Sequence, residues 1–315
     1  MDSNNKTALI AIGGNSLIKT GERGTLDEQF KNALDTARNI VKMVQRGWKV
    51  VITHGNGPQV GAALIRSERA SSEVYTHTLD MCVATTQSEI GYLLQRAFYQ
   101  SLKEVNLNLP VTVVPTMVVV DPNDPAFKNP TKPIGPFYDR KTAEERQKKL
   151  GWNIVEDANR GWRRVVPSPE PLDIVEFDVI KSLVESGVVT IALGGGGIPV
   201  YFNNGKIIGC EAVIDKDRSS ALLASKLGVD LFLISTATDY VYLDFKKTTR
   251  KPLTKMTSDE AEKYLAEGHF PAGSMGPKIE SAIRYLRNGG KQVLITSYEF
   301  IEDGLEGKAG TQILL

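Results

Sequence analysis

Three lysines of this sequence stand in stiff or glycine-rich surroundings, where a positive charge can be held in a fixed position. Lys132 lies among prolines in NPTKPIGPF, Lys216 stands between two aspartates in VIDKD, and Lys278 follows Pro277 in GSMGPK. Each one taken alone is most simply a solvated surface lysine, but prolines reduce the freedom that a segment loses when it is ordered. Phosphoryl transfer needs positive groups on both sides of the moving phosphoryl, together with a metal ion. The three lysines therefore indicate a site for that chemistry.

Glycine clusters follow three apolar stretches of the chain. They are Gly13-Gly14-Asn15, Gly55-Asn56-Gly57 and the run from Gly194 to Gly197. Glycine is costly to order, so four in succession at the end of a strand are a poor way to build a core. Bare backbone lets N–H groups approach an anion closely, and a following helix N-terminus favours negative charge. Tight turns explain one such cluster, whereas three clusters at equivalent places favour a shared anion site.

The elements that must position these residues alternate between strands and helices. Predicted strands are 7–12, 49–53, 111–120, 188–193, 230–235, 240–245, 291–297 and 310–315, with a hairpin over 199–209. Predicted helices are 27–46, one from about 59, 80–104, 173–187, 216–227, 257–267 and 278–288, with Asp173 as the N-cap of the fourth. This alternation predicts an α/β protein whose parallel sheet is covered on both faces. Ligands of such sheets bind at the carboxyl ends of the strands.

Residues 121–171 break this rhythm. They hold eight of the fifteen prolines, and their apolar residues fit neither the helical nor the strand period. We expect this segment to be a flap, a small subdomain inserted into the alternating core.

Composition excludes several classes of protein. The 38 Lys and Arg nearly balance the 37 Asp and Glu, which argues against nucleic acid as a partner. The longest apolar stretch, 111–120, is interrupted by proline and too short to span a bilayer. Cys82 and Cys210 have no CxxC spacing, so we expect no structural zinc and a reducing compartment. The polar start of the chain predicts no secretory signal and thus a cytoplasmic location. P-loop, Rossmann and protein-kinase motifs are missing, and Ser16 stands in no GxSxG elbow.

Eight motifs, in order along nearly the whole chain, carry a family resemblance. AIGGNSL, THGNGPQVG, NPTKPIGPF, ED-N-RGWRRVVPSP, GGGGIPV, AVIDKD, GHFPAGSMGPKI and GKAGT closely resemble the carbamate kinases of the amino acid kinase superfamily. The resemblance implies a three-layer αβα sandwich about a mostly parallel sheet of about eight strands, with a protruding subdomain. It implies an N-terminal lobe over 1–187 for carbamoyl phosphate, a C-terminal lobe over 188–315 for the nucleotide, and a homodimer.

The reaction implied is reversible, Mg-dependent transfer between ATP and carbamate, giving ADP and carbamoyl phosphate. It usually runs toward ATP in arginine or related catabolism. The resemblance assigns Lys132, Lys216, Asp217 and Lys278 to catalysis; Gly13, Gly14, Asn15, Gly55, Asn56 and Gly57 to the substrate; and Gly195, Gly196, Thr236, Asp239, Met275 and Pro277 to the nucleotide. In these roles the lysines neutralise phosphate charge, Lys132 reaches in from the flap, and Asp217 orients the other lysines. Magnesium is carried by the nucleotide, without an assigned protein ligand.

Several positions differ from the family pattern. Sister kinases place a lysine two residues before the first Gly-Gly, where this chain has Ala11, and Lys132 is the obvious replacement for that charge. Ser88 and Asn159 stand where the family usually has glycine, and Thr238 replaces an apolar residue near the adenine. Two alternatives therefore stay open: a related kinase for another small carboxylate or phosphonate, and a non-catalytic sensor of carbamoyl phosphate or nucleotide. The intact lysines and Asp217 argue against the sensor.

Overall fold

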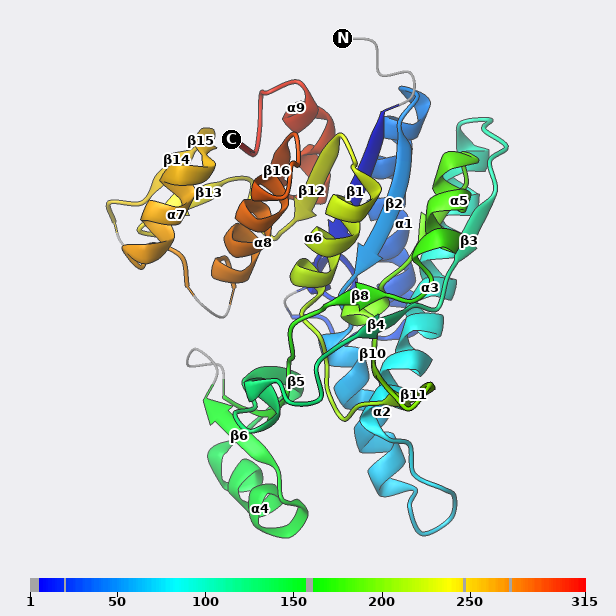
Figure 1. Cartoon of the computed structure of the whole chain (residues 1–315), viewed down its shortest axis with the longest axis vertical. Coiled ribbons are helices and arrows are strands. Elements are labelled where there is room, and N and C mark those ends of the chain that lie inside the picture. The colour runs from blue at the N-terminus through cyan, green and yellow to red at the C-terminus, as the bar shows by residue number, and fades with distance from the viewer. Residues whose placement is uncertain (1–5, 20, 157–160, 246–247, 272–273) are drawn as a thin grey trace.

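Eight strands form one sheet, in the order β15-β17-β16-β12-β1-β2-β9-β3. The computed structural model describes residues 6–19, 21–156, 161–245, 248–271 and 274–315 (Figure 1). The strands are β1 (Thr7–Ile12), β2 (Lys49–His54), β3 (Val111–Val113), β9 (Val189–Ile191), β12 (Leu231–Ser235), β15 (Lys255–Thr257), β16 (Val293–Thr296) and β17 (Thr311–Leu314). All neighbours pair in parallel except β16 and β17. The predicted mostly parallel sheet of about eight strands is confirmed.

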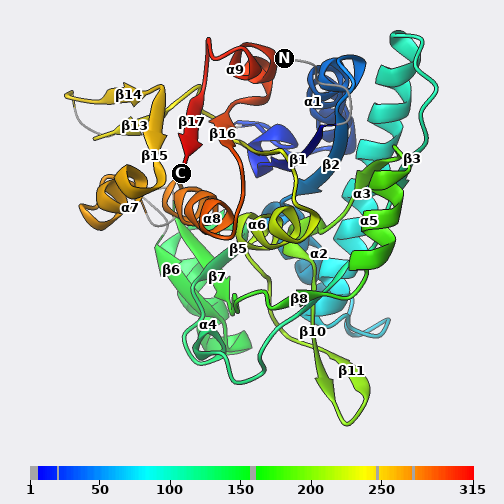
Figure 2. The same ribbon diagram turned by 45° about the horizontal axis from the view of Figure 1, so that its top comes forward.

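Helices cover both faces of this sheet, which makes three layers. One face carries α1 (Leu26–Gln45), α3 (Leu79–Glu104) and α9 (Ile301–Leu305); the other carries α5 (Phe177–Glu185), α6 (Lys216–Leu227), α7 (Ser258–Ala266) and α8 (Gly276–Arg287). Figures 1 and 2 show α6 and α8 side by side across the second face. Alternate residues of β1 enter different cores, Leu9 on the side of α6 and Ile10 on the side of α1. A strand buried on both faces reads as a continuous apolar run, as TALIAI does.

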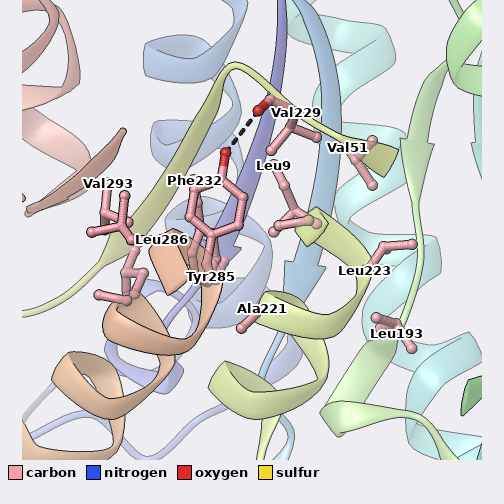
Figure 3. Packing of buried hydrophobic residues seen from close by; sticks show 14 of the residues in the cluster. Leu9, Val51, Leu193, Ala221, Leu223, Val229, Phe232, Tyr285, Leu286 and Val293 are labelled. Atoms are coloured by element: carbon pink, nitrogen blue, oxygen red, sulfur yellow. Dashed lines mark hydrogen bonds between the residues drawn. The ribbon is translucent and has the colours of Figure 1, made fainter. Parts of the chain in front are cut away.

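An aromatic pair lies in the core between the sheet and α8 (Figure 3). The rings of Phe232 on β12 and Tyr285 on α8 meet edge to face, with centroids 5.5 Å apart. The Tyr285 hydroxyl donates to the Val229 carbonyl at 2.7 Å, so burial leaves this phenol with a partner. The contact fixes α8, which carries Lys278 in its first turn.

The prediction of one strand over 111–120 is wrong. The chain leaves the main sheet after β3 and enters a second sheet as β4 (Met117–Val119), in the order β11-β10-β4-β8. Pro115 lies at the break, where it has no N–H to give to a ladder. The next N–H, of Thr116, donates instead to the side chain of Gln87 on α3 at 2.9 Å. The other strands of this sheet are β8 (Asp173–Ile174), β10 (Ile198–Asn203) and β11 (Lys206–Gly209), and the last two form the predicted hairpin.

The helix predicted over 173–187 begins four residues late, and Asp173 is not its N-cap. Asp173 and Ile174 pair with β4, and the N-cap of α5 is Glu176. One carboxylate oxygen of Asp173 accepts from the Ile174 N–H and binds Lys226. At Asp173 and Ile174, the Asx-type interaction with the next residue and the pairing in the second sheet outweigh helix propensity.

The inserted subdomain is present between Lys132 and Val166. It consists of β5 (Lys132–Tyr138), α4 (Arg140–Leu150), β6 (Asn153–Glu156) and β7 (Trp162–Val166), with β7 at the centre of a three-stranded sheet. Figure 1 shows α4 and β6 protruding on the side opposite the N-terminus. On the main body, β5 packs against α2 (Gly57–Arg69).

The remaining short strands are β13 (Val241–Leu243) and β14 (Lys251–Leu253), which form a two-stranded ribbon. None of the described helices is long and apolar enough to cross a membrane.

Candidate active site

The carboxyl ends of three adjacent strands bring the glycine clusters to one edge of the sheet. β1 ends in Gly13-Gly14, β2 in Gly55, and β9 in the short helix Gly194–Gly196. A Cβ built on Gly55 would lie 3.8 Å from the Gly14 nitrogen and 3.7 Å from Cδ of Lys216. The clusters are therefore in contact, as three parallel neighbours require.

Three of the four consecutive glycines are required by conformation and by space. One of them is Gly197, which has φ +94° and whose built Cβ would lie 2.2 Å from Cγ2 of Val118. Gly195 has φ +67° and Gly196 has φ +95°, a backbone region that side chains rarely adopt. A Cβ on Gly195 would lie 2.2 Å from Nδ2 of Asn56, and one on Gly196 would lie 2.4 Å from the Ile214 carbonyl oxygen. The bare backbone lets the loop after β9 lie against the loop after β2 and the entry to α6.

A buried carboxylate joins two of the three lysines. Nζ of Lys216 lies 2.6 Å from Oδ1 of Asp217, and Nζ of Lys278 lies 3.2 Å from Oδ2 of the same residue. The side chains of Lys216 and Asp217 are only 10% and 5% exposed. Burial lowers the pKa of Lys216. Burial also acts to raise the pKa of Asp217, but the charges of Lys216 and Lys278 outweigh it and hold that pKa below its ordinary value.

The third lysine, Lys132, lies on the inserted subdomain. Lys132 is the first residue of β5, and its Nζ binds Oδ2 of Asp215, the residue just before α6. The chain separation is 83 residues. Lys132, Lys216, Asp217 and Lys278 thus meet at the N-terminus of α6, where the helix dipole favours an anion.

A cavity of about 680 Å³ contains this cluster. Its wall includes Gly14, Gly55, Asn56, Gly57 and Gly195. Six cationic side chains in the lining face three carboxylates, so the wall carries a net positive formal charge: Lys19, Arg23, Lys132, Arg163, Lys216 and Lys278 against Glu22, Asp215 and Asp217. A ligand with several negative charges would be stabilised there.

A second cavity, of about 400 Å³, adjoins the first. Gly14, Ser274 and Lys278 line both cavities, so Lys278 stands at their junction. The rest of its wall is largely aromatic or apolar and includes Tyr240, Tyr242, Phe245, Phe270 and Met275. Concave walls of this kind suit the flat faces of a base, with the charged groups at one end only.

The structure separates the six predicted nucleotide residues. Thr236 and Met275 line the second cavity, Gly195 and Pro277 line the first, and Gly196 and Asp239 line neither. Asp239 instead accepts from the Tyr242 hydroxyl at 2.9 Å, and Tyr242 lines the second cavity. Asp239 therefore holds an aromatic residue of the second cavity's wall, and its contact with a nucleotide stays a prediction.

Other predicted positions lie as follows. Of the substrate set, Gly13 lines the second cavity, and Nδ2 of Asn56 donates to the Thr86 hydroxyl at 2.9 Å. The backbone of Asn15 lies in the turn after β1, but its side chain lies outside the described residues, as does Asn159. Among the departures from the family pattern, Ser88 is exposed on α3, away from both linings. Thr238 lines the second cavity.

Sequence reasoning missed Asp215 and the aromatic residues of the second cavity. Asp215 was visible only as a flank of Lys216, because its partner Lys132 comes from a separate subdomain. Tyr242, Phe245 and Phe270 occur at no regular spacing. Their common feature is the cavity itself, which no local pattern encodes.

No group of three or more histidines, cysteines and carboxylates gathers in a metal-binding arrangement within the described part of the chain. The two carboxylates nearest the cluster, Asp215 and Asp217, are each bound by lysine. The donor set therefore fits a divalent ion that is held mainly by phosphate oxygens and water, as magnesium commonly is with nucleotides.

Comparison with known proteins agrees with this geometry. Residues 6–297 match the model of the amino acid kinase family, and the chain belongs to that family. It is 46% identical to the carbamate kinase of Thermococcus kodakarensis over 98% of this chain and 99% of the relative. It is 44% identical to that of Staphylococcus haemolyticus, over 97% and 98%. The solved carbamate kinase from Giardia lamblia bound to AMP-PNP superposes with a TM-score of 0.91 at 41% identity, covering 100% of this chain and 99% of the other. Within the family, the chain groups with the carbamate kinases.

Proposed function

We propose that this chain is a carbamate kinase, which transfers a phosphoryl group reversibly between ATP and carbamate and gives ADP and carbamoyl phosphate. The observation that carries the proposal is the buried cluster of Lys216, Asp217 and Lys278 at the junction of two cavities. One cavity is cationic and glycine-walled, and the other is aromatic. This division matches a small phosphorylated substrate on one side and a nucleoside on the other.

The cluster supplies what phosphoryl transfer requires. Little covalent help is needed, and the protein must hold donor and acceptor in line while it stabilises charge on the moving group. Lys278 can reach a phosphoryl group at the junction, and Lys216 lies beside Gly14 and Gly55. Asp217 binds both ammonium groups and orients them. The backbone N–H groups after β1 lie next to them and can receive phosphoryl oxygens.

Magnesium would come with the nucleotide and offset charge on its phosphates. Lys132 would bind carbamoyl phosphate from the subdomain, while Gly55, Asn56 and Gly57 border the carbamate. Thr236, Met275 and the aromatic walls would hold the adenosine. Residues 1–187 and 188–315 would act as the carbamoyl-phosphate lobe and the nucleotide lobe.

The cellular setting follows from the same family likeness. We propose a cytoplasmic homodimer that runs mainly toward ATP in arginine or related catabolism. Light scattering coupled to size exclusion tests the dimer directly, because a mass near that of one 34.5 kDa chain contradicts it.

The first test measures ATP formation from MgADP and carbamoyl phosphate, coupled to hexokinase and glucose-6-phosphate dehydrogenase. The unsubstituted protein should turn over readily. Lys216→Ala should lower kcat by about 10²–10³-fold or more, the usual cost of losing one group that stabilises transition-state charge. Circular dichroism and nucleotide binding check that the variant is folded.

Three outcomes separate the possible functions. Activity of the unsubstituted protein that is lost in Lys216→Ala supports the proposal, and full activity of the variant contradicts the assigned role. No turnover in a folded, nucleotide-binding protein contradicts carbamate kinase activity. A panel of small carboxylates and phosphonates then distinguishes a related kinase from a sensor.

A further inference from the structure

Asp215 holds two separate partners with its two carboxylate oxygens. It is the N-cap of α6, and its Oδ1 accepts from the Asp217 N–H at 2.9 Å. Its Oδ2 binds Nζ of Lys132, which belongs to the inserted subdomain. The side chain is 14% exposed and lines the cationic cavity. One residue therefore links the subdomain to the helix that begins with Lys216.

The N-cap interaction fixes the direction of the carboxylate. Because Oδ1 is held by the backbone of α6, Oδ2 points from a defined place at the edge of the cavity. The ammonium group that it binds is therefore held in a defined place too. A lysine side chain has a flexible four-carbon stem and loses much rotamer freedom when it is ordered. The Lys132 side chain is 26% exposed and lines the cationic cavity, and Asp215 is the carboxylate that holds its ammonium group.

Two carboxylates thus share the three lysines of the cluster. Asp217 orients Lys216 and Lys278, and Asp215 orients Lys132. The two carboxylates lie two residues apart, one just before the helix and one inside its first turn. With three positive and two negative groups, the cluster keeps an excess positive charge toward an incoming anion.

Resting on the function proposed above, we propose that Asp215 is a positioning residue, which presents the ammonium group of Lys132 to carbamoyl phosphate before the substrate binds. Its effect passes through Lys132 and not through the nucleotide. Lysine has three N–H donors, so the ammonium group of Lys132 can bind Asp215 and the substrate phosphate at the same time. Loss of Asp215 should therefore impair use of carbamoyl phosphate and leave nucleotide binding intact.

Asp215→Asn isolates this role, because asparagine caps helices about as well as aspartate does. The variant keeps an acceptor for the Asp217 N–H but loses the charge that holds Lys132. We expect kcat/KM for carbamoyl phosphate to fall by about tenfold, the size of one lost charge-assisted hydrogen bond. The KM for MgADP and the melting temperature should stay close to those of the unsubstituted protein.

A double-variant cycle separates positioning from a merely structural effect. If Asp215 acts through Lys132, Asp215→Asn should cost little further in a Lys132→Ala background, whereas independent losses would multiply. Asp173→Asn is the matched control, because it breaks another lysine–aspartate pair, with Lys226, away from both cavities. It should have the kinetics of the unsubstituted protein.

The results distinguish this inference from the proposed function. Unchanged kcat/KM for carbamoyl phosphate in Asp215→Asn, or losses that multiply in the double variant, overturn the role of Asp215 alone. An equal rise in the KM for MgADP overturns it too, because the effect would then be general. If the unsubstituted protein makes no ATP under the same conditions, the proposed function fails and the role of Asp215 falls with it.

Discussion

His54, at the end of β2, shows how closely a single side chain is enclosed at this site. Its Nδ1 lies 3.1 Å from the Gly55 carbonyl oxygen, and a Cβ on Gly194 would lie 2.6 Å from its Nε2. Burial lowers the pKa of His54 to about 4; a backbone hydrogen bond to Gly55 opposes this, and the charge of Lys216 adds to it. The ring is therefore neutral at pH 7, and it supports the loops around it without adding charge.

This pKa predicts that stability falls with acidification. Below about pH 6.5 the unfolded chain protonates His54 while the folded protein does not, so the unfolded state binds more protons. The folded state should lose up to about 3 kcal/mol of unfolding free energy between pH 6.5 and pH 4 from this residue. Urea unfolding at a series of pH values measures the slope.

His54→Gln serves as the control for this prediction. It removes the titrating group at some cost in packing, so the gap in unfolding free energy between the two proteins should narrow as the pH falls. Parallel curves between pH 6.5 and 4 would contradict the assignment to His54. Asp215 and Asp217 do not confuse the comparison: their pKa values lie below the ordinary aspartate value, so their contributions are lost at still lower pH.

At the same scale, the sequence located most of the candidate site. Lys132, Lys216 and Lys278 were singled out by their surroundings, and the family motifs added Asp217 as their partner. Local chemistry marks such residues because glycine and proline constrain the backbone beside them. The partners of Asp239 and Asp215 could not be predicted from local sequence in this way. Whether a carboxylate holds a tyrosine, a lysine or a ligand depends on segments that meet only after folding.

At the scale of elements, the contact between α2 and β5 decides where the subdomain sits. Gly61 on α2 faces Gly135 on β5, and a Cβ on Gly61 would lie 2.1 Å from the Gly135 Cα. Gly135 itself has φ +72°. The pair Arg164–Glu68, 2.7 Å apart, ties β7 to the same helix. The backbone of β5 can therefore approach α2 this closely only because Gly61 has no side chain, whereas Gly135 is required by its backbone conformation.

Gly61→Ala should push β5 and Lys132 away from the cluster. We expect the free energy of unfolding to fall by about 1–3 kcal/mol, as overpacking usually causes. We expect kcat/KM for carbamoyl phosphate to fall by about tenfold or more, because small displacements of a positioned group are costly. Binding of MgADP, measured by calorimetry, should change little, since the second cavity is lined by other elements.

Gly151→Ala is a suitable control within the same subdomain. Gly151 ends α4 with φ +67°, and nothing lies within 4 Å of a Cβ built there. Its substitution carries a backbone strain of about 1–2 kcal/mol, which is similar in size to the overpacking cost of Gly61→Ala but involves no clash. Kinetics like those of the unsubstituted protein are expected. Equal kinetic losses in both variants would show that stability of the subdomain, and not its position, controls activity.

Helices and strands were predictable where the period of the apolar residues agreed with the capping or turn residues at both ends. The helix over 216–227 was placed at its observed bounds, because aspartate before it and glycine after it are strong signals. Two errors have the same cause. The strand over 111–120 and the helix over 173–187 both contain a short stretch that joins the second sheet, as β4 and as β8. Strands of two or three residues carry no periodic pattern, and their pairing is decided by the rest of the fold.

At the scale of the whole molecule, the sheet does not divide along the chain. β9 comes after residue 187, yet it lies between β2 and β3, and β12 lies beside β1. Thr190 on β9 is the partner of Val51 on one side and of Thr112 on the other. Each of the proposed lobes therefore depends on strands of the other to satisfy its backbone in the interior.

This arrangement predicts that residues 1–187 do not fold alone. Without β9, the buried edges of β2 and β3 would have unpaired N–H and carbonyl groups, and without β12 so would β1. Circular dichroism of the fragment should show no cooperative thermal transition. Coexpression with residues 188–315 should restore both the transition and ATP formation, because the second fragment supplies the missing strands. A cooperative transition in the isolated fragment would mean that β2 and β3 can close on each other without β9, and the carbamoyl-phosphate lobe would then be an independent folding unit.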